Sequence, residues 1–176
     1  EIKNQMATDY NKLYAESDNV CGAPFKELIA FFNDISATKT LKILDAGCGQ
    51  GRDTLLMAVL GHIVHAIDTS PIGIQQILTQ AATQHLSITA EVADIRSYTT
   101  HKQFDVVLID RVLHMLSADE RIPTLERYLG LVATSGFLLL MDTPANIKPF
   151  NQFLKKTDDW KTCLQTNNTL FTQKIS

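Results

Sequence analysis

A glycine-rich stretch between an apolar run and a helical pattern constrains this fold more than any other feature. Three of the five residues 47–51 are glycines. Glycine lacks Cβ, so the chain can turn sharply there and a ligand can approach main-chain N–H groups. Residues 41–44 read as a buried strand, and apolar residues recur at helical spacing over 55–60. The sequence therefore predicts a strand, a glycine loop and a helix, with a ligand site at the loop.

The spacing of the glycines separates two classes of ligand. Dinucleotide sites use G-x-G-x-x-G, which would place the third glycine at position 52. Here the third glycine is one residue earlier, at Gly51, and the acidic Asp45 stands two residues before Gly47. This pattern resembles motif I of the class I S-adenosylmethionine-dependent methyltransferases. The alternative is an ordinary tight turn between a strand and a helix.

The resemblance implies a cofactor site around the loop. In the family the loop wraps the aminocarboxypropyl end of S-adenosylmethionine. The cofactor-binding residues carried over are Asp45, Gly47, Cys48, Gly49 and Gly51. Cys48 reads as a small packing residue rather than a nucleophile.

A second apolar run, residues 63–68, ends in Asp68, 21 positions after Gly47. An acid about 20 residues after the first glycine meets the ribose in nucleoside-binding α/β folds. Asp68 therefore supports both an adenosylmethionine and a nicotinamide dinucleotide site. Ser70 is predicted to cap a helix with Pro71 at its first position. Thr69 and Ser70 can also offer hydroxyl or N–H groups to the adenosine.

Two further stretches match the family's later motifs. Residues 87–93 form a predicted strand, and the resemblance implies that Asp94 meets the adenine amino group while Ile95 contacts the ring. Residues 104–110 are near-continuously apolar, as expected for a parallel strand covered on both faces. This strand and the following turn resemble motif IV, which places Asp110 beside both the cofactor and the transferring methyl group.

The catalytic candidates follow that strand. Methyl transfer from a sulfonium is an in-line displacement, so the protein chiefly positions the acceptor, and a base matters only if the acceptor loses a proton. We select His114 as base or orienter, with Asp110 and Arg111 beside it. A loop histidine that contacts backbone is the alternative for His114. Arg111 could bind an anionic substrate, or pair with Asp105 or Asp110.

The N-terminal residues 1–38 are predicted to form a helical lid, with apolar residues at helical spacing over 25–35. Tyr10 and Tyr14 are candidates for ligand contacts, with core packing as the alternative. Residues 39–176 would form the cofactor-binding core, so that residues 1–176 make one domain.

Several predictions concern the C-terminal half. Ser117 and Glu120 form a capping-box pattern, and Pro123 predicts a kink or a later helix start. A turn at 134–136 is expected to lead into a strand at 137–142, and a short helix should cover 150–156. Residues 160–165 and 169–174 read as a β-hairpin. The fold class predicted is α/β and Rossmann-like: a mostly parallel seven-stranded sheet that ends in an antiparallel hairpin, with helices on both faces.

Composition excludes some classes of binding partner. The 176 residues carry a net charge of −3, so there is no basic field for nucleic acid. Apolar runs are too short for a membrane span. The three cysteines suggest neither a disulfide framework nor a metal cluster, and no metal site is expected. We expect a cytoplasmic monomer or homodimer.

The resemblance implies an S-adenosyl-L-methionine-dependent methyltransferase that produces S-adenosyl-L-homocysteine. The compact body and residues 47–53 look most like the branch that includes tellurite-resistance and thiopurine-type methyltransferases. A small soluble acceptor is therefore expected, such as a thiol or a chalcogen oxyanion. One alternative is a non-catalytic adenosylmethionine-binding or partner-regulating subunit. The other is a nicotinamide oxidoreductase, disfavoured by the glycine spacing and the hairpin.

Overall fold

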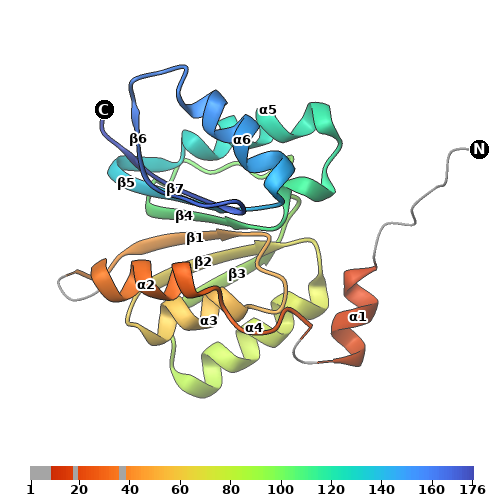
Figure 1. The fold of residues 1–176 in the computed structure, drawn as a ribbon. Helices are drawn as coiled ribbons and strands as arrows, with labels where there is room; N and C mark the ends of the chain where they lie inside the picture. The colour runs from red at the N-terminus through yellow and green to blue at the C-terminus, as the bar shows by residue number, and fades with distance from the viewer. Residues whose placement is uncertain (1–8, 18–19, 36–38) are drawn as a thin grey trace, which may run out of the picture.

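The computed structural model describes residues 9–17, 20–35 and 39–176, which build one seven-stranded sheet (Figure 1). The strand order is β3-β2-β1-β4-β5-β7-β6. Strands β1 to β5 pair in parallel, and β7 runs antiparallel to both β5 and β6. The strands are β1 (Lys42–Ala46), β2 (Ile63–Asp68), β3 (Ile88–Val92), β4 (Phe104–Asp110), β5 (Val132–Met141), β6 (Trp160–Gln165) and β7 (Thr169–Lys174). The predicted fold class, including the C-terminal hairpin, is confirmed.

Helices cover both faces of the sheet. Figure 1 shows α2, α3 and α4 on one face and α5 and α6 on the other, while α1 lies to the side, in contact with α4. The helices are α1 (Tyr10–Glu16), α2 (Lys26–Ile35), α3 (Arg52–Val59), α4 (Pro71–Gln84), α5 (Ala118–Leu129) and α6 (Pro144–Leu154), with a 3-10 helix η1 (Leu113–Met115).

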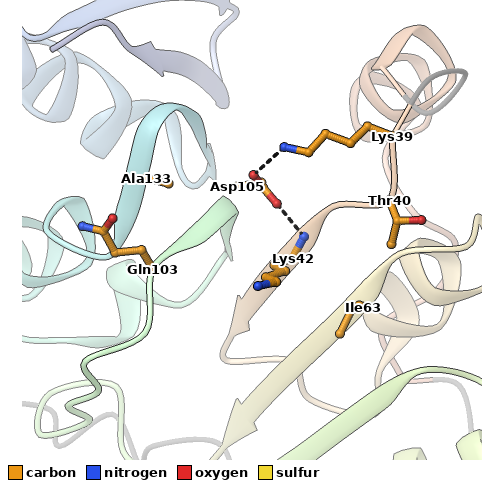
Figure 2. Close-up of a pocket in the computed structure, with 7 residues that line it drawn as sticks. All are labelled: Lys39, Thr40, Lys42, Ile63, Gln103, Asp105 and Ala133. Atoms are coloured by element: carbon orange, nitrogen blue, oxygen red, sulfur yellow. Dashed lines mark hydrogen bonds and ion pairs between the residues drawn. The ribbon is translucent and has the colours of Figure 1, made fainter.

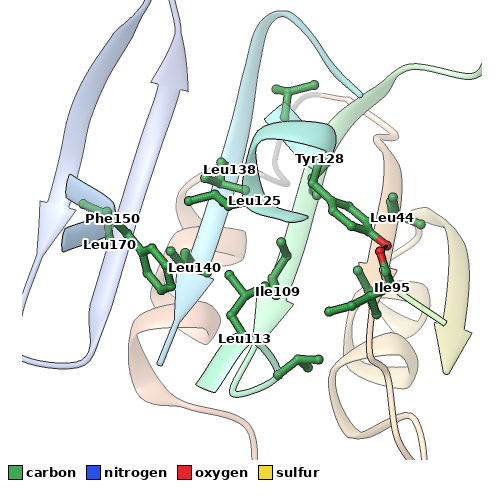
Figure 3. Packing of buried hydrophobic residues seen from close by; sticks show 14 of the residues in the cluster. Leu44, Ile95, Ile109, Leu113, Leu125, Tyr128, Leu138, Leu140, Phe150 and Leu170 are labelled. Atoms are coloured by element: carbon green, nitrogen blue, oxygen red, sulfur yellow. Dashed lines mark hydrogen bonds between the residues drawn. The ribbon is translucent and has the colours of Figure 1, made fainter. Parts of the chain in front are cut away.

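Two apolar clusters fill the space between the helices and the sheet. One packs α2 and α3 against β1 and β4, with Leu28 and Phe32 fully buried. The other packs α5 and α6 against the opposite face and includes Leu125, Tyr128 and Phe150 (Figure 3). A parallel sheet buried on both faces needs apolar side chains in both directions, which explains the unbroken apolar run of β4.

Three element boundaries differ from those predicted. Helix α5 begins at Ala118 and includes Pro123, so the predicted later start is wrong. The Glu120 carboxylate accepts one hydrogen bond from the Ser117 backbone N–H at 3.1 Å and another from the Ser117 hydroxyl at 2.6 Å. These two bonds fix the start of the helix. Strand β5 begins at Val132, and the predicted turn at 134–136 is instead an irregularity within it, where Ser135 takes a φ of 64°. Helix α6 begins at Pro144, six residues before the predicted start.

Turns rather than a helix join β3 to β4 across residues 93–103. Beside them, the two ring nitrogens of His65 lie 2.8 Å from Thr89 Oγ1 and 2.9 Å from Glu91 Oε1. Ile95 of the linker packs in the core cluster, and the buried hydroxyl of Tyr128 in α5 donates to the Ile95 carbonyl at 3.1 Å (Figure 3).

We predict that Tyr128→Phe lowers the free energy of unfolding by about 1–3 kcal/mol, because the Ile95 carbonyl loses its buried donor. Urea denaturation measures the change. Val59→Ala, at a side chain that is 62% exposed, serves as control and should stay within about 0.5 kcal/mol of the parent. Equal stability of the Tyr128 variant and the parent would contradict the assignment.

Candidate active site

The carboxyl ends of the parallel strands bring the predicted site residues to one edge of the sheet. Because β2, β1, β4 and β5 are neighbours in that order, residues at their ends lie side by side. Asp45 and the glycine loop come from β1, Asp68 from β2 and Asp110 from β4. Ligands of open α/β sheets bind at this edge.

The glycine loop depends on backbone conformations that suit glycine. The φ angles of Gly47, Gly49 and Gly51 are 82°, 56° and 86°. The amides of Gly47 and Cys48 donate to the Ile67 carbonyl at 2.8 and 3.0 Å, which anchors the loop to β2. The loop is therefore a fixed turn whose backbone is not covered by its own side chains.

Asp68 ties this loop to the start of α4. One of its oxygens accepts from the Gly49 amide at 2.9 Å and the other from the Ser70 amide at 2.8 Å. Ser70 is buried, and its hydroxyl caps α4 by accepting from the Gly73 amide at 3.1 Å, whereas Thr69 is exposed. The predicted ribose acid thus also positions the loop.

A charged cluster lies beneath the loop. The guanidinium of Arg52 binds both oxygens of Asp53, at 2.9 and 2.6 Å, and also pairs with Asp110. Asp45 is only 2% exposed and accepts from the Thr54 hydroxyl at 2.5 Å. Burial, followed by repulsion from Asp53, raises the pKa of Asp45 to about 8. Arg52 thus holds together carboxylates that would otherwise repel one another.

Asp110 faces this cluster with one oxygen unused. Its Oδ1 is buried without a hydrogen-bond donor, and the Arg111 Nε lies 3.5 Å away. Burial and then the Asp53 charge raise the pKa of Asp110 to about 6. Arg111 has a φ of 52° and a half-exposed side chain whose guanidinium lies 4.9 Å from the centre of the Phe25 ring. Arg111 thus contacts both Asp110 and Phe25 while about half of its side chain stays exposed.

His114 lies in η1, in the turn after β4. Its ring is 34% exposed, and Nδ1 lies 3.8 Å from Asp142 Oδ1 at the end of β5. The His114 amide donates to the other oxygen of Asp142 at 3.1 Å. The structure therefore groups His114, Asp110 and Arg111 in one region, at the ends of β4 and β5.

Asp94 and Ile95 follow β3 at the same edge. Arg96 lies 2.5 Å from Asp94, and its hydrogen bond lowers the pKa of that carboxyl. The Ile95 side chain is 5% exposed and packs in the core cluster beneath α5. Asp94 is therefore the more accessible of the two.

The N-terminal segment is hydrogen-bonded to the glycine loop. Gln50 donates to the Ser17 carbonyl at 2.5 Å and accepts from the Val20 amide at 2.9 Å. The hydroxyl of Tyr14 lies 2.7 Å from where a Cβ on Gly49 would stand, so this buried side chain touches the loop. Residues 1–8, 18–19 and 36–38 of the predicted lid lie outside the described residues.

The sequence prediction missed four polar residues at this edge: Gln50, Arg52, Asp53 and Asp142. The first three adjoin the glycines, so their position was a usable signal. Asp142 ends a predicted strand in the same way as Asp110 does. The suggested partnership of Arg111 with Asp105 is wrong, because Asp105 lies at the amino end of β4, where it binds Lys39 and the Lys42 amide at 3.1 and 2.8 Å.

Asp105 lines a cavity of about 490 Å³ at the opposite edge of the sheet (Figure 2). Lys39, Lys42 and Ile63 line it as well, at the amino ends of β1 and β2. This cavity is separate from the glycine loop. Within the described ranges, no three His, Cys, Asp or Glu side chains are grouped to hold a metal ion. Nor does that part of the chain contain a helix long and apolar enough to cross a membrane.

Comparison with known proteins identifies the family. A family model described as a methyltransferase domain matches residues 43–136, which span β1 to the middle of β5. The chain belongs to this family. The resemblance to class I S-adenosylmethionine-dependent methyltransferases is confirmed, and the nicotinamide oxidoreductase alternative is not supported.

Individual relatives agree with this assignment. The chain is 27% identical over 163 residues to a ubiquinone biosynthesis O-methyltransferase of Rickettsia bellii, across 81% of this chain and 66% of that protein. TehB from Haemophilus influenzae has a similar fold, with a TM-score of 0.73 at 17% identity over 94% of this chain and 67% of that one. The N-methyltransferase NodS of Bradyrhizobium japonicum, solved with S-adenosyl-L-homocysteine, gives a TM-score of 0.71 at 14% identity over 96% and 100%. The matched region spans less than a third of the first curated relatives.

We predict that Gly51→Ala destabilises the protein more than Gly61→Ala. Both residues have a positive φ, 86° and 91°, so both variants carry a strain of about 1–2 kcal/mol. A Cβ at Gly51 would lie 2.4 Å from Ile77 Cγ1, whereas nothing lies within 4 Å of one at Gly61. Denaturant unfolding measures the free energy of unfolding of both variants. Equal losses would show that the Ile77 side chain moves aside without cost and would contradict the prediction.

We predict that Asp45→Asn gains stability relative to the parent as the pH rises. The folded pKa of Asp45, about 8, exceeds its ordinary value of 3.8, so its stabilising contribution is complete below pH 3.8 and is lost as the pH rises through 8. Asparagine keeps an acceptor for Thr54 and does not titrate. Between pH 5 and 9, the unfolding free energy of the variant minus that of the parent should increase by more than about 1.4 kcal/mol. Parallel pH profiles would contradict this.

Proposed function

We propose that this protein transfers a methyl group from S-adenosylmethionine to a small soluble acceptor. The observation that carries the proposal is the charged cluster beneath the glycine loop. The aminocarboxypropyl end of the cofactor bears an ammonium and a carboxylate. The donor-free Oδ1 of Asp110 suits the ammonium, and the guanidinium of Arg52 suits the carboxylate.

The other cofactor contacts proposed follow the strand ends. Asp68 would bind the ribose while it holds the Gly49 amide, with Thr69 and Ser70 beside it. Asp94 would meet the adenine, and Ile95 would support that side from the core. Gly47, Cys48 and Gly51 shape the loop around the amino-acid end. Tyr14 and the rest of α1 would cover the bound cofactor as a lid.

When bound, the cofactor supplies an electrophilic methyl group, and the protein's residues orient the acceptor. His114 and Arg111 follow β4 next to Asp110, where the methyl group would lie. Arg111, half-exposed and stacked on Phe25, would bind an anionic part of the acceptor. Thiols and chalcogen oxyanions remain the acceptor classes that we propose to screen first. Because the ubiquinone-biosynthesis relative is named as an O-methyltransferase, we add hydroxyl compounds to the acceptors to be screened.

Calorimetric titration with S-adenosylmethionine, S-adenosylhomocysteine and NADH tests the proposal. We expect binding of the two adenosyl ligands and none of NADH. Asp68→Asn should weaken adenosylhomocysteine binding at least about tenfold, because an amide replaces an acceptor that both the loop and the ribose need. The matched Asp105→Asn, at the opposite edge, should stay within about twofold. Unchanged affinity in Asp68→Asn would remove the ribose assignment.

Turnover distinguishes an enzyme from a non-catalytic adenosylmethionine-binding subunit. Adenosylhomocysteine formation in the presence of an acceptor supports the enzyme. Cofactor binding without turnover on any class screened would favour the regulatory alternative.

A further inference from the structure

In the described part of the chain, four buried side-chain nitrogen or oxygen atoms have no hydrogen-bond partner, and two of them lie at the proposed reaction site. They are Asp110 Oδ1 and His114 Nδ1. A buried polar atom without a partner costs free energy, so such atoms call for an explanation. Asp110 Oδ1 is accounted for by the proposed cofactor contact. His114 Nδ1 is not.

The acceptor facing His114 Nδ1 is Asp142, which is 3% exposed at the carboxyl end of β5. Its Oδ1 accepts from the Thr143 amide at 2.7 Å and from the Asn146 side chain at 2.8 Å. Its Oδ2 accepts from the His114 amide at 3.1 Å. The carboxylate is therefore fixed, and its Oδ1 lies 3.8 Å from the imidazole nitrogen. This distance is too long for a hydrogen bond, but catalytic contacts are often longer before ligands bind.

A second side chain fixes the other side of the turn. Arg121 of α5 donates to the His114 carbonyl at 3.2 Å and to the Leu116 carbonyl at 3.1 Å. It also donates to Asn146 at 2.9 Å, the same side chain that binds Asp142. The backbone of η1 is thus held from both α5 and the end of β5.

The exposure of the ring shows which nitrogen can meet a substrate. Nδ1 is buried although the side chain is 34% exposed, and Nε2 is not one of the described buried atoms without a partner, so Nε2 is the ring nitrogen open to a substrate. A hydrogen bond at one ring nitrogen decides the protonation of the other. With an anionic acceptor at Nδ1, the proton stays on Nδ1 and Nε2 keeps its lone pair.

We propose that Asp142 is a positioning residue that holds His114 as the Nδ1–H tautomer, so that Nε2 accepts the proton of an O–H or S–H methyl acceptor. This inference rests on the proposed function and narrows its acceptor class. The acceptor oxygen or sulfur forms the new bond to the methyl carbon, and the pair of the broken S–CH₃ bond stays on the cofactor sulfur. The acceptor proton passes to Nε2, which leaves an imidazolium stabilised by Asp142. Water later takes that proton.

The ¹⁵N spectrum of the His114 ring tests the proposal without any acceptor. The spectrum is recorded on the full chain at alkaline pH, and the signals are assigned by their loss in His114→Gln. We expect Nδ1–H in the parent protein. A dominant Nε2–H tautomer would overturn the proposal, and this measurement needs no variant at position 142.

Variants then test whether Asp142 is the cause. Asp142→Asn should shift the ring toward Nε2–H, because a neutral amide attracts the Nδ1 proton less strongly than a carboxylate does. Asp142→Glu, which keeps the carboxylate, should retain more of the Nδ1–H form and keeps the test decisive if the asparagine variant does not fold. Asp105→Asn should leave the tautomer unchanged. An Nδ1–H ring in Asp142→Asn would show that another group sets it.

Kinetics link the tautomer to catalysis once an acceptor turns over. Asp142→Asn should lower kcat at least about tenfold and leave the adenosylhomocysteine Kd within about twofold. In a His114→Ala background it should cause little further loss, since Asp142 acts through His114. If the two substitutions together lower kcat by the product of their separate effects, the positioning role of Asp142 is overturned. Lack of cofactor binding in the parent would instead refute the proposed function and leave the tautomer measurement valid.

Discussion

The parallel pairing of β1 with both β2 and β4 is the constraint on which the rest of this structure depends. Strand β1 lies inside the sheet between β2 and β4, so its carboxyl end has a neighbouring strand end on each side. Residues far apart in the sequence, Asp45, Asp68 and Asp110, thereby meet at one edge. The same pairing buries β1 and β4 on both faces, which commits the chain to helices above and below the sheet.

The acidic side chains that meet at this edge repel one another, and the positive charge of Arg52 offsets this repulsion. Asp53 and Asp110 both contact its guanidinium, while the Asp45 pKa rises to about 8 through burial and through repulsion from Asp53. Arg111 adds a second positive charge 3.5 Å from Asp110 Oδ1, but that oxygen still has no hydrogen-bond donor. This arrangement suits a zwitterionic ligand, since its ammonium can donate to Asp110 while its carboxylate meets the arginine.

The region around His114, where we propose that the acceptor binds, is organised differently. There the fold uses hydrogen bonds between side chains and backbone: Asp142 accepts from the His114 amide, and Arg121 donates to the His114 carbonyl. A turn fixed at both peptide groups places its side chain reproducibly, which is what an in-line transfer requires of the groups that orient the acceptor. The proposed cofactor side thus relies on charge, and the proposed acceptor side on hydrogen bonds that fix the backbone of the turn.

The sequence by itself determined the elements and their class, because glycine spacing, apolar periodicity and turn residues act locally. It predicted β4 and the C-terminal hairpin with their observed bounds, and it identified the acids at the ends of β1, β2 and β4. Tertiary structure alone decided which of these groups touch. Arg52 reaches Asp110 from 58 positions away, and Asp142 reaches His114 from 28. Asp105 and Asp110, at opposite ends of one strand, belong to opposite edges of the sheet. Such contacts depend on strand order and on burial from both faces, which no local pattern encodes.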